Sequence, residues 1–260
     1  MKPGGRVDAV LVCGGRWHDF DFARRELLTA LGRHDRVKTQ VFADYDSRGA
    51  LDTADVLVTY TCDVRPTDDQ QTELEAFVER GGRWLALHGT NSAIDAPAVF
   101  GSGEPFRTPR VIDRMTRVLG SQFLGHPPIT PYMVEVTDAD HPLVRGITPF
   151  EVTDELYCSE LHGPLDVLLH THYTGAFDGF EEGDWPDDDP RPVLYVKGGV
   201  CYFTLGHCRG PLDMQEFVDE YPRVERGSWD VPEYRTILDR CIAWAATGSF
   251  TDTEASLASR

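Results

Sequence analysis

Short strand-like runs alternate with amphipathic stretches through the N-terminal third of the chain, and this alternation constrains the fold most strongly. The runs cover residues 8–13, 37–42, 54–60 and 84–87. Short apolar or alternating runs bounded by Gly, Asp or Asn are typical of buried strands. Because strands that alternate with helices pair in parallel through right-handed crossovers, the pattern predicts a doubly wound, mostly parallel α/β sheet with helices on both faces.

Three stretches have the spacing of helices that cover such a sheet. Residues 20–33 place their large apolar side chains on one face. A second helix is expected to begin after Thr67, whose hydroxyl can accept an early backbone N–H, and to end at Gly81. Residues 234–245 repeat apolar side chains three and four apart, so we expect a closing amphipathic helix there.

The C-terminal half carries a different signal. Residues 192–196 and 200–205 flank Lys197-Gly198-Gly199, which predicts a late β-hairpin. Residues 92–131 are rich in Pro and Gly and long enough to form a lid or wall over the sheet edge, with a helix near 111–119. We expect a single domain over residues 1–250 and a flexible C-terminal tail over residues 251–260.

Charge and composition exclude several classes of function. The net charge of −18, from 43 acidic and 25 basic residues, argues against a nucleic-acid partner, because phosphate binding needs a basic surface. No apolar run approaches the roughly 20 residues that span a bilayer, and the N-terminus lacks a signal-peptide core. The six cysteines are scattered without a CxxC pair. We therefore expect a cytoplasmic protein with reduced core thiols, no membrane partner, and a surface compatible with a homo-oligomer.

Three histidines occupy the same kind of position. His18 follows the first predicted strand, His88 ends the fourth, and His207 ends the second arm of the hairpin. In open α/β sheets, ligands bind outside the carboxyl ends of the strands, so these side chains could converge. Three neutral imidazoles suit zinc or a similar divalent metal. Asp19, Asp154 or Glu155 could complete or orient such a site.

The same region also allows chemistry without a metal. His88, His207, Asp19 and Glu155 could act as general acids and bases on a polar substrate, and no HExxH motif decides between the two readings. Gly14-Gly15 is not part of a GxGxxG motif, so no nicotinamide cofactor is expected.

Substrate contacts can be predicted beside these groups. Trp17 and Tyr157 offer flat surfaces on which a sugar could stack, and Asn91 and Tyr157 could form hydrogen bonds with it. His126 lies in a turn-like context and receives no predicted role.

An ordered set of motifs resembles a known family. Gly14-Gly-Arg-Trp-His-Asp-Phe20, Leu85-Ala-Leu-His-Gly89, Asp154-Glu-Leu-Tyr157 and Cys201-Tyr-Phe-Thr-Leu-Gly-His207 together look like the trehalose-utilisation ThuA-like family, over about residues 7–247. The resemblance implies a flavodoxin-like sheet of the kind found in class I glutamine amidotransferases. It also implies a role in bacterial carbohydrate metabolism, notably of disaccharides oxidised at the 3-position.

The chain departs from the amidotransferases at two positions. Where those enzymes place a cysteine nucleophile, this chain has His88-Gly89, and after His207 it lacks the Glu of their His-Pro-Glu motif. Glutaminase chemistry is therefore not expected. Together with the resemblance, the histidines predict a hydrolase, lyase or isomerase that acts on a sugar or 3-keto-sugar derivative in a His-lined crevice, with or without the assistance of a metal ion. The alternative is a non-catalytic sugar-binding or regulatory module with a degenerate amidotransferase-like site.

Overall fold

A nine-stranded mixed sheet forms the centre of the computed structural model, which describes residues 5–99, 101–214, 217–219 and 222–250. The parallel half contains β1 (Val7–Gly15), β2 (Val37–Phe42), β3 (Val56–Cys62), β4 (Arg83–Leu87) and β13 (Val200–Phe203). Their order is β2-β1-β3-β4-β13, as in flavodoxin-like sheets, with the strand order reversing between β1 and β3. The predicted doubly wound parallel sheet is confirmed in this half.

The predicted hairpin turns the second half of the sheet antiparallel. β13 pairs with β12 (Arg191–Lys197), and the sheet continues through β9 (Asp166–Thr171), β6 (Thr130–Val136) and β7 (Phe150–Asp154). Two small sheets pair β5 (Ser121–Gly125) with β8 (Cys158–Leu161) and β10 (Gly175–Ala176) with β11 (Asp184–Trp185). Only the hairpin among these pairings follows from a local turn signal.

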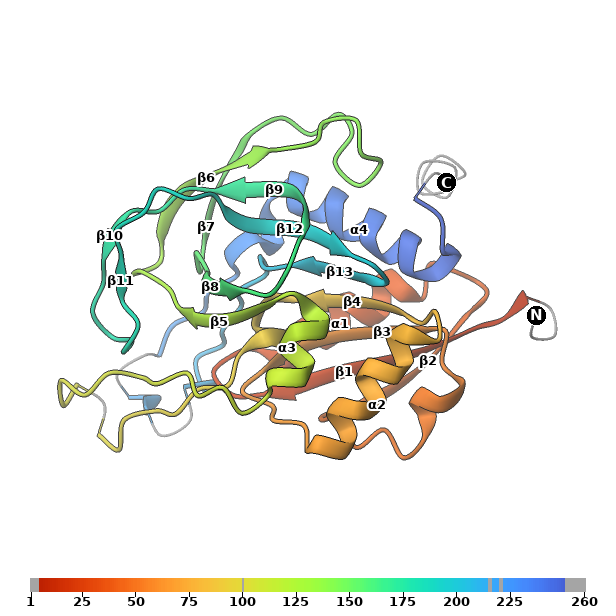
Figure 1. Ribbon diagram of the computed structural model, residues 1–260, viewed down its shortest axis with the longest axis horizontal. Coiled ribbons are helices and arrows are strands. Elements are labelled where there is room, and N and C mark those ends of the chain that lie inside the picture. The colour runs from red at the N-terminus through yellow and green to blue at the C-terminus, as the bar shows by residue number, and fades with distance from the viewer. Residues whose placement is uncertain (1–4, 100, 215–216, 220–221, 251–260) are drawn as a thin grey trace.

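Helices cover both faces of the sheet (Figure 1). α1 (Phe20–Leu31) and α4 (Pro232–Thr247) pack on one face, and α2 (Asp68–Glu79) and α3 (Asp113–Leu119) pack on the other. The Thr67 side chain caps α2 as predicted, in a reciprocal capping box with Gln70. Short 3₁₀ turns occur at η2 (Ala50–Thr53), η3 (His88–Asn91) and η5 (Gly227–Asp230).

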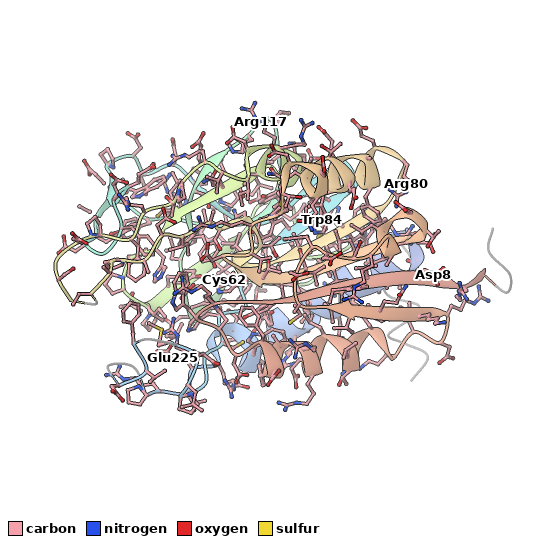
Figure 2. All side chains as sticks on the ribbon, turned by 90° about the horizontal axis from the view of Figure 1, so that it is seen from below. Asp8, Cys62, Arg80, Trp84, Arg117 and Glu225 are labelled. Carbon is pink, nitrogen blue, oxygen red and sulfur yellow. The ribbon has the colours of Figure 1, made fainter. Side chains whose placement is uncertain are left out.

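Two hydrophobic cores result, because successive residues of a strand face opposite sides of the sheet. Leu11 and Leu85 pack toward α1 and α4, whereas Val10 and Trp84 pack toward α2 and α3. All six cysteines are buried and free, as core thiols are expected to be. Figure 2 shows the resulting layers with all side chains and places Asp8, near the start of β1, at the opposite end of the sheet from Cys62, the last residue of β3.

Within the part of the chain that the structure describes, no helix is long and apolar enough to cross a membrane. The predicted tail over residues 251–260 lies outside the described residues.

Candidate functional site

The carboxyl ends of the parallel strands meet at one edge of the sheet, where the backbone is strained. Trp17, Asp63 and His88 follow β1, β3 and β4 with positive φ angles of 66°, 55° and 46°. The next residue is packed so closely that only glycine fits, because a Cβ atom on Gly89 would lie 2.6 Å from the Thr61 carbonyl oxygen. Left-handed backbone conformations at residues other than glycine are concentrated at functional sites, so we expect a functional site at this edge of the sheet.

Four buried side chains converge at this edge. Nitrogen atoms of His18, His88 and His207 and a carboxylate oxygen of Glu155 all lie within 4.8 Å of one another. The Nε2 atoms of His18 and His88 are 2.8 Å apart, and Glu155 Oε2 lies 3.3 Å from His88 Nε2. The predicted meeting of the three histidines is therefore what the structure has, with Glu155 as the fourth member. We call this set the histidine–glutamate centre.

Each of the three imidazole rings is oriented by its outward-facing nitrogen. His18 Nδ1 donates to the Arg16 carbonyl at 3.2 Å, and His88 Nδ1 donates to the Thr204 carbonyl at 2.9 Å. His207 Nε2 donates to Glu225 at 2.8 Å. Carbonyl and carboxylate oxygens only accept, so these nitrogens carry the protons. In the neutral rings, the lone pairs of the other three nitrogens then face inward, which is the arrangement of histidines that bind metals.

The electrostatics of the centre are dominated by burial and by two carboxylates. Burial lowers the pKa of His18 to about 4, so that this ring is neutral. Burial also favours a neutral His207, but the charge of Glu155 and the hydrogen bond with Glu225 outweigh it and raise the pKa of His207 to about 9. Although burial opposes its charge, the neighbouring His207 and His126 hold the pKa of Glu155 well below its usual range. Glu155 is therefore ionised at neutral pH.

Glu225 and Arg209 form a second layer around His207. The Arg209 guanidinium pairs with Glu225 at 2.8 Å and lies 3.6 Å from Glu155. The backbones of Arg209 and Glu225 are joined by an antiparallel bridge. Two positions after His207, where the amidotransferases have the Glu of His-Pro-Glu, this chain has Arg209. The structure supplies the missing histidine–carboxylate pair from a distant loop, for which the sequence has no local signal.

Asp154 fixes the position of the centre without belonging to it. This buried carboxylate accepts hydrogen bonds from the backbone N–H groups of Gly206, His207 and Ser228 at 3.1, 3.2 and 2.8 Å. It also accepts from the Ser228 hydroxyl at 2.5 Å. Since Glu155 is its neighbour in sequence, Asp154 ties both Glu155 and His207 to the end of the sheet.

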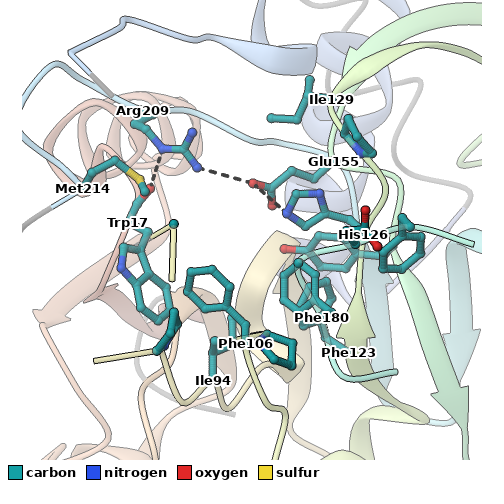
Figure 3. Close-up of a pocket in the computed structure, with 18 of the residues that line it drawn as sticks. Trp17, Ile94, Phe106, Phe123, His126, Ile129, Glu155, Phe180, Arg209 and Met214 are labelled. Carbon is teal, nitrogen blue, oxygen red and sulfur yellow. Dashed lines mark hydrogen bonds and ion pairs between the residues drawn. The ribbon is translucent and has the colours of Figure 1, made fainter. Parts of the chain in front are cut away.

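A cavity of about 890 Å³ opens beside the centre (Figure 3). His18, Glu155, Arg209 and Glu225 contribute polar groups to its lining, together with predicted substrate contacts Trp17 and Tyr157. The segment predicted to be a lid or wall forms part of the lining, through side chains that include Ile94, Pro97, Phe106, Phe123, His126 and Ile129. The Tyr157 hydroxyl lies 3.3 Å from His88 Nε2, so the cavity reaches the centre directly.

Two predicted site residues lie elsewhere. Asp19 caps α1 by accepting from the Phe22 N–H at 2.9 Å and pairs with Arg226 at 3.2 Å. The Asn91 side chain donates to the Ser121 hydroxyl at 2.8 Å and is not part of the lining of the large cavity. Their roles in proton transfer and substrate binding stay predictions that the geometry does not favour.

His126 is a site residue that sequence reasoning missed. Its side chain lines the cavity, and its Nε2 atom lies 3.7 Å from Glu155 Oε1. It follows β5, a strand that sequence analysis did not predict. Because β5 belongs to the separate antiparallel β5–β8 sheet, the rule that parallel strands share a carboxyl edge does not place His126 beside the centre.

The fold and the site define a flavodoxin-like α/β protein with a buried histidine–glutamate centre at the carboxyl edge of its parallel strands. The chain belongs to the ThuA family, described as trehalose utilisation, whose family model matches residues 9–220. This supports a carbohydrate-related role. The search of curated proteins finds no match.

Two solved structures share the fold over almost the whole chain. A ThuA-like protein from Parabacteroides merdae is 15% identical, with a TM-score of 0.59 over 94% of this chain and 91% of that chain. A ThuA-like protein from Bacteroides uniformis is 16% identical, with a TM-score of 0.60 over 95% and 93% of the two chains. At these identities the likeness shows the fold alone.

Proposed function

We propose that this protein is a sugar-processing enzyme that acts on a sugar or 3-keto-sugar derivative, with a divalent metal such as zinc held by His18, His88, His207 and Glu155. One observation carries the proposal. All three rings donate their outward N–H to a fixed acceptor, which turns the other nitrogen of each ring into the centre. A cation can bind all three once His207, which Glu155 and Glu225 favour in its protonated form, releases its Nδ1 proton. The sugar is supported by the family to which the chain belongs.

The donor set fits a metal ion. Two imidazole nitrogens at 2.8 Å cannot both present lone pairs to each other unless a proton or a metal ion lies between them. His207 Nδ1 is buried and lies 3.0 Å from Glu155 Oε1, so a bound metal ion would take the place of the proton that this pair holds. Three imidazole nitrogens and a carboxylate are ligands that zinc and neighbouring transition metals accept.

A divalent metal ion bound there would polarise a carbonyl or hydroxyl oxygen of the sugar. The chain's own residues would position the sugar and move protons. Tyr157 presents its hydroxyl between the cavity and His88, and it can hydrogen-bond to a sugar oxygen. Arg209 holds Glu225 against His207 and so fixes the ring orientation.

His126 is the best-placed general base. Its Nδ1 donates to the Pro127 carbonyl at 2.7 Å, so in the neutral ring Nε2 is unprotonated. That nitrogen belongs to a side chain that lines the cavity. It could take a proton from a carbon or hydroxyl next to a polarised sugar carbonyl, the opening step of both elimination and isomerisation. We therefore favour a lyase or isomerase over a hydrolase.

Metal analysis tests the proposal. The purified chain is stripped with a chelator, reloaded with zinc, and its bound metal is measured by mass spectrometry alongside turnover of 3-keto-glucosides. We expect about one zinc per chain, and its loss together with turnover in His88→Ala. His172→Ala, at an exposed histidine outside the cavity, is the matched control and should keep both. Sugar binding without metal or turnover would instead favour a non-catalytic sugar-binding module.

A further inference from the structure

A continuous row of aromatic rings follows the cavity from one side of the histidine–glutamate centre to the other. The ring of Tyr157 lies 4.5 Å from that of Phe123, and Phe123 lies 5.5 Å from Phe180. Phe180 lies 5.6 Å from Phe106, which lies 6.0 Å from Trp17. These are distances at which aromatic rings attract one another. We call these five side chains the aromatic arc.

The aromatic arc faces the polar side of the cavity. In Figure 3, Arg209 and Glu155 lie on one side, and Phe106, Phe180 and Phe123 lie across from them. Trp17, whose carbonyl accepts from Arg209 at 3.1 Å, connects the two sides. Ile94, next to Phe106 and Trp17 in the same view, extends the apolar surface. The cavity therefore has one charged wall and one flat, apolar wall.

The aromatic arc is fixed before any ligand arrives. The Phe106 N–H donates to the Gly179 carbonyl at 2.7 Å, and the Phe106 carbonyl accepts from the Glu181 N–H at 2.9 Å. Arg110 joins the same two segments by pairing with Glu182, and it also binds Glu160 at 2.9 Å. A preformed apolar wall binds a rigid flat group without a large cost of ordering.

The cavity is larger than a single sugar ring needs, and one of its walls is more apolar than a sugar requires. Its volume of about 890 Å³ lies in the upper range of small-molecule sites. A second sugar ring could stack one face on the apolar wall, but its edge hydroxyl groups would then lie against apolar side chains, which costs free energy. A flat apolar group carries no such hydroxyl groups and can bury its whole surface there. Apart from the histidine–glutamate centre and the Arg209–Glu225 pair, the cavity lining contains three charged residues. All three are exposed to solvent and do not belong to the apolar wall; they are Glu104, Asp178 and Arg223.

We infer that the substrate is a glycoside whose non-reacting part is a flat, apolar group such as a phenol ring. The sugar lies at the histidine–glutamate centre, and the flat group packs on the aromatic arc. The inference rests on the proposed function for the sugar end, and on the aromatic arc for the other end. It distinguishes the substrate from a disaccharide, whose second ring is polar on its edges.

Equilibrium binding to the zinc-loaded full chain tests this inference. Phenyl glucoside, methyl glucoside and trehalose are titrated calorimetrically, with the two glucosides in the same anomeric form. We expect phenyl glucoside to bind at least about ten-fold more tightly than the other two, the effect of packing one aromatic ring. Phe106→Ala should bring the affinity ratio of phenyl to methyl glucoside toward one. Phe106→Leu keeps a large apolar side chain and should retain part of the affinity ratio. It therefore distinguishes loss of the aromatic ring from misfolding of the chain.

Phe42→Ala is the matched control, because Phe42 is also half-buried but lies on the edge strand β2, outside the cavity lining. It should leave the ratio unchanged. Trehalose binding as tightly as phenyl glucoside, or an unchanged ratio in Phe106→Ala, would overturn the inference while leaving the metal-dependent sugar enzyme in place. Conversely, a phenyl preference in a protein that binds no metal would overturn the proposed chemistry alone. Failure of all three glycosides to bind would also overturn the inference, while turnover of 3-keto-glucosides would still test the proposed function separately.

Discussion

The Nε2 atoms of His18 and His88 lie 2.8 Å apart, although the two residues are separated by 70 positions in the chain. Each ring turns its Nδ1 toward a backbone carbonyl, so neither can rotate the other nitrogen into the contact without losing a buried hydrogen bond. At this distance the two nitrogens share either a proton, as in an N–H···N hydrogen bond, or the metal ion that we propose.

Removing the carboxylate behind His207 should weaken metal binding rather than abolish it. Glu225→Gln removes the charge that holds the proton on His207 Nε2 and so turns Nδ1 toward the metal ion. We therefore expect the zinc dissociation constant to rise about 10- to 100-fold. Competition with a chromophoric chelator measures it. Glu151→Gln, at an exposed position of β7, should have no effect. Equal affinities in the two variants would contradict a role for Glu225 in orienting His207.

Asp154 is expected to stabilise the folded chain. Asp154→Ala leaves the N–H groups of Gly206, His207 and Ser228 buried without partners, so the free energy of unfolding should fall by about 3–5 kcal/mol. Urea denaturation followed by circular dichroism measures the loss. Asp52→Ala, at an exposed aspartate in η2, should change it by less than about 0.5 kcal/mol. A loss of similar size in both variants would argue against the buried hydrogen bonds as its cause.

Close packing of β1 against β3 can be tested at Gly15. A Cβ atom there would lie 2.0 Å from the Cys62 carbonyl oxygen, and the residue has a φ of 127°. Gly81 also has a positive φ, of 90°, but its Cβ would meet nothing within 4 Å. Gly81→Ala should therefore cost about 1–2 kcal/mol through backbone strain alone. Gly15→Ala should lower the melting temperature further, as a thermal scan of both variants would reveal.

Stability should fall at alkaline pH because buried thiols resist ionisation. Burial raises the pKa of Cys13 and of Cys158 from 9.0 to about 12. The thiols of the unfolded chain ionise near pH 9, whereas the buried thiols stay protonated until about pH 12. Burial of each thiol therefore leaves the stability unchanged below pH 9, and stability is lost as the pH rises from 9 toward 12. Each group adds a slope of about 1.4 kcal/mol per pH unit in that window. Cys13→Ala should flatten the dependence measured by urea denaturation between pH 9 and 10.5, and an unchanged slope would contradict this origin.

Much of the parallel half of the fold could be predicted from sequence, because hydrophobic periodicity is a local property. The β2 strand has the predicted bounds of 37–42, and α2 is capped at Thr67 as expected. The helix expected near residue 111 begins at Asp113. Pairings such as β6 with β9, or β5 with β8, depend on backbone hydrogen bonds between distant segments and have no local signature.

The candidate site also contains residues that local sequence patterns predict and residues that they do not. His18, His88 and His207 were predictable because each directly follows or ends a strand, and the carboxyl ends of parallel strands share an edge. For Asp19 the sequence allows two roles, because an acid before a helix is equally typical of an N-cap; the structure shows the N-cap hydrogen bond from the Phe22 N–H, and the role in proton transfer stays a prediction. His126 and Glu225 come from segments whose course is irregular, so their proximity to the centre could not be read from spacing.

Local sequence patterns predict the parallel strands, the helices that cover them, and the placement of three histidines on one side of the sheet. They do so because side-chain periodicity and turn residues act over a few positions. The folding of distant segments onto one another brings Glu155 to the histidines, places Glu225 against His207 and sets an aromatic wall opposite them. These relationships join residues far apart in the chain, where packing and burial rather than local preference fix the geometry.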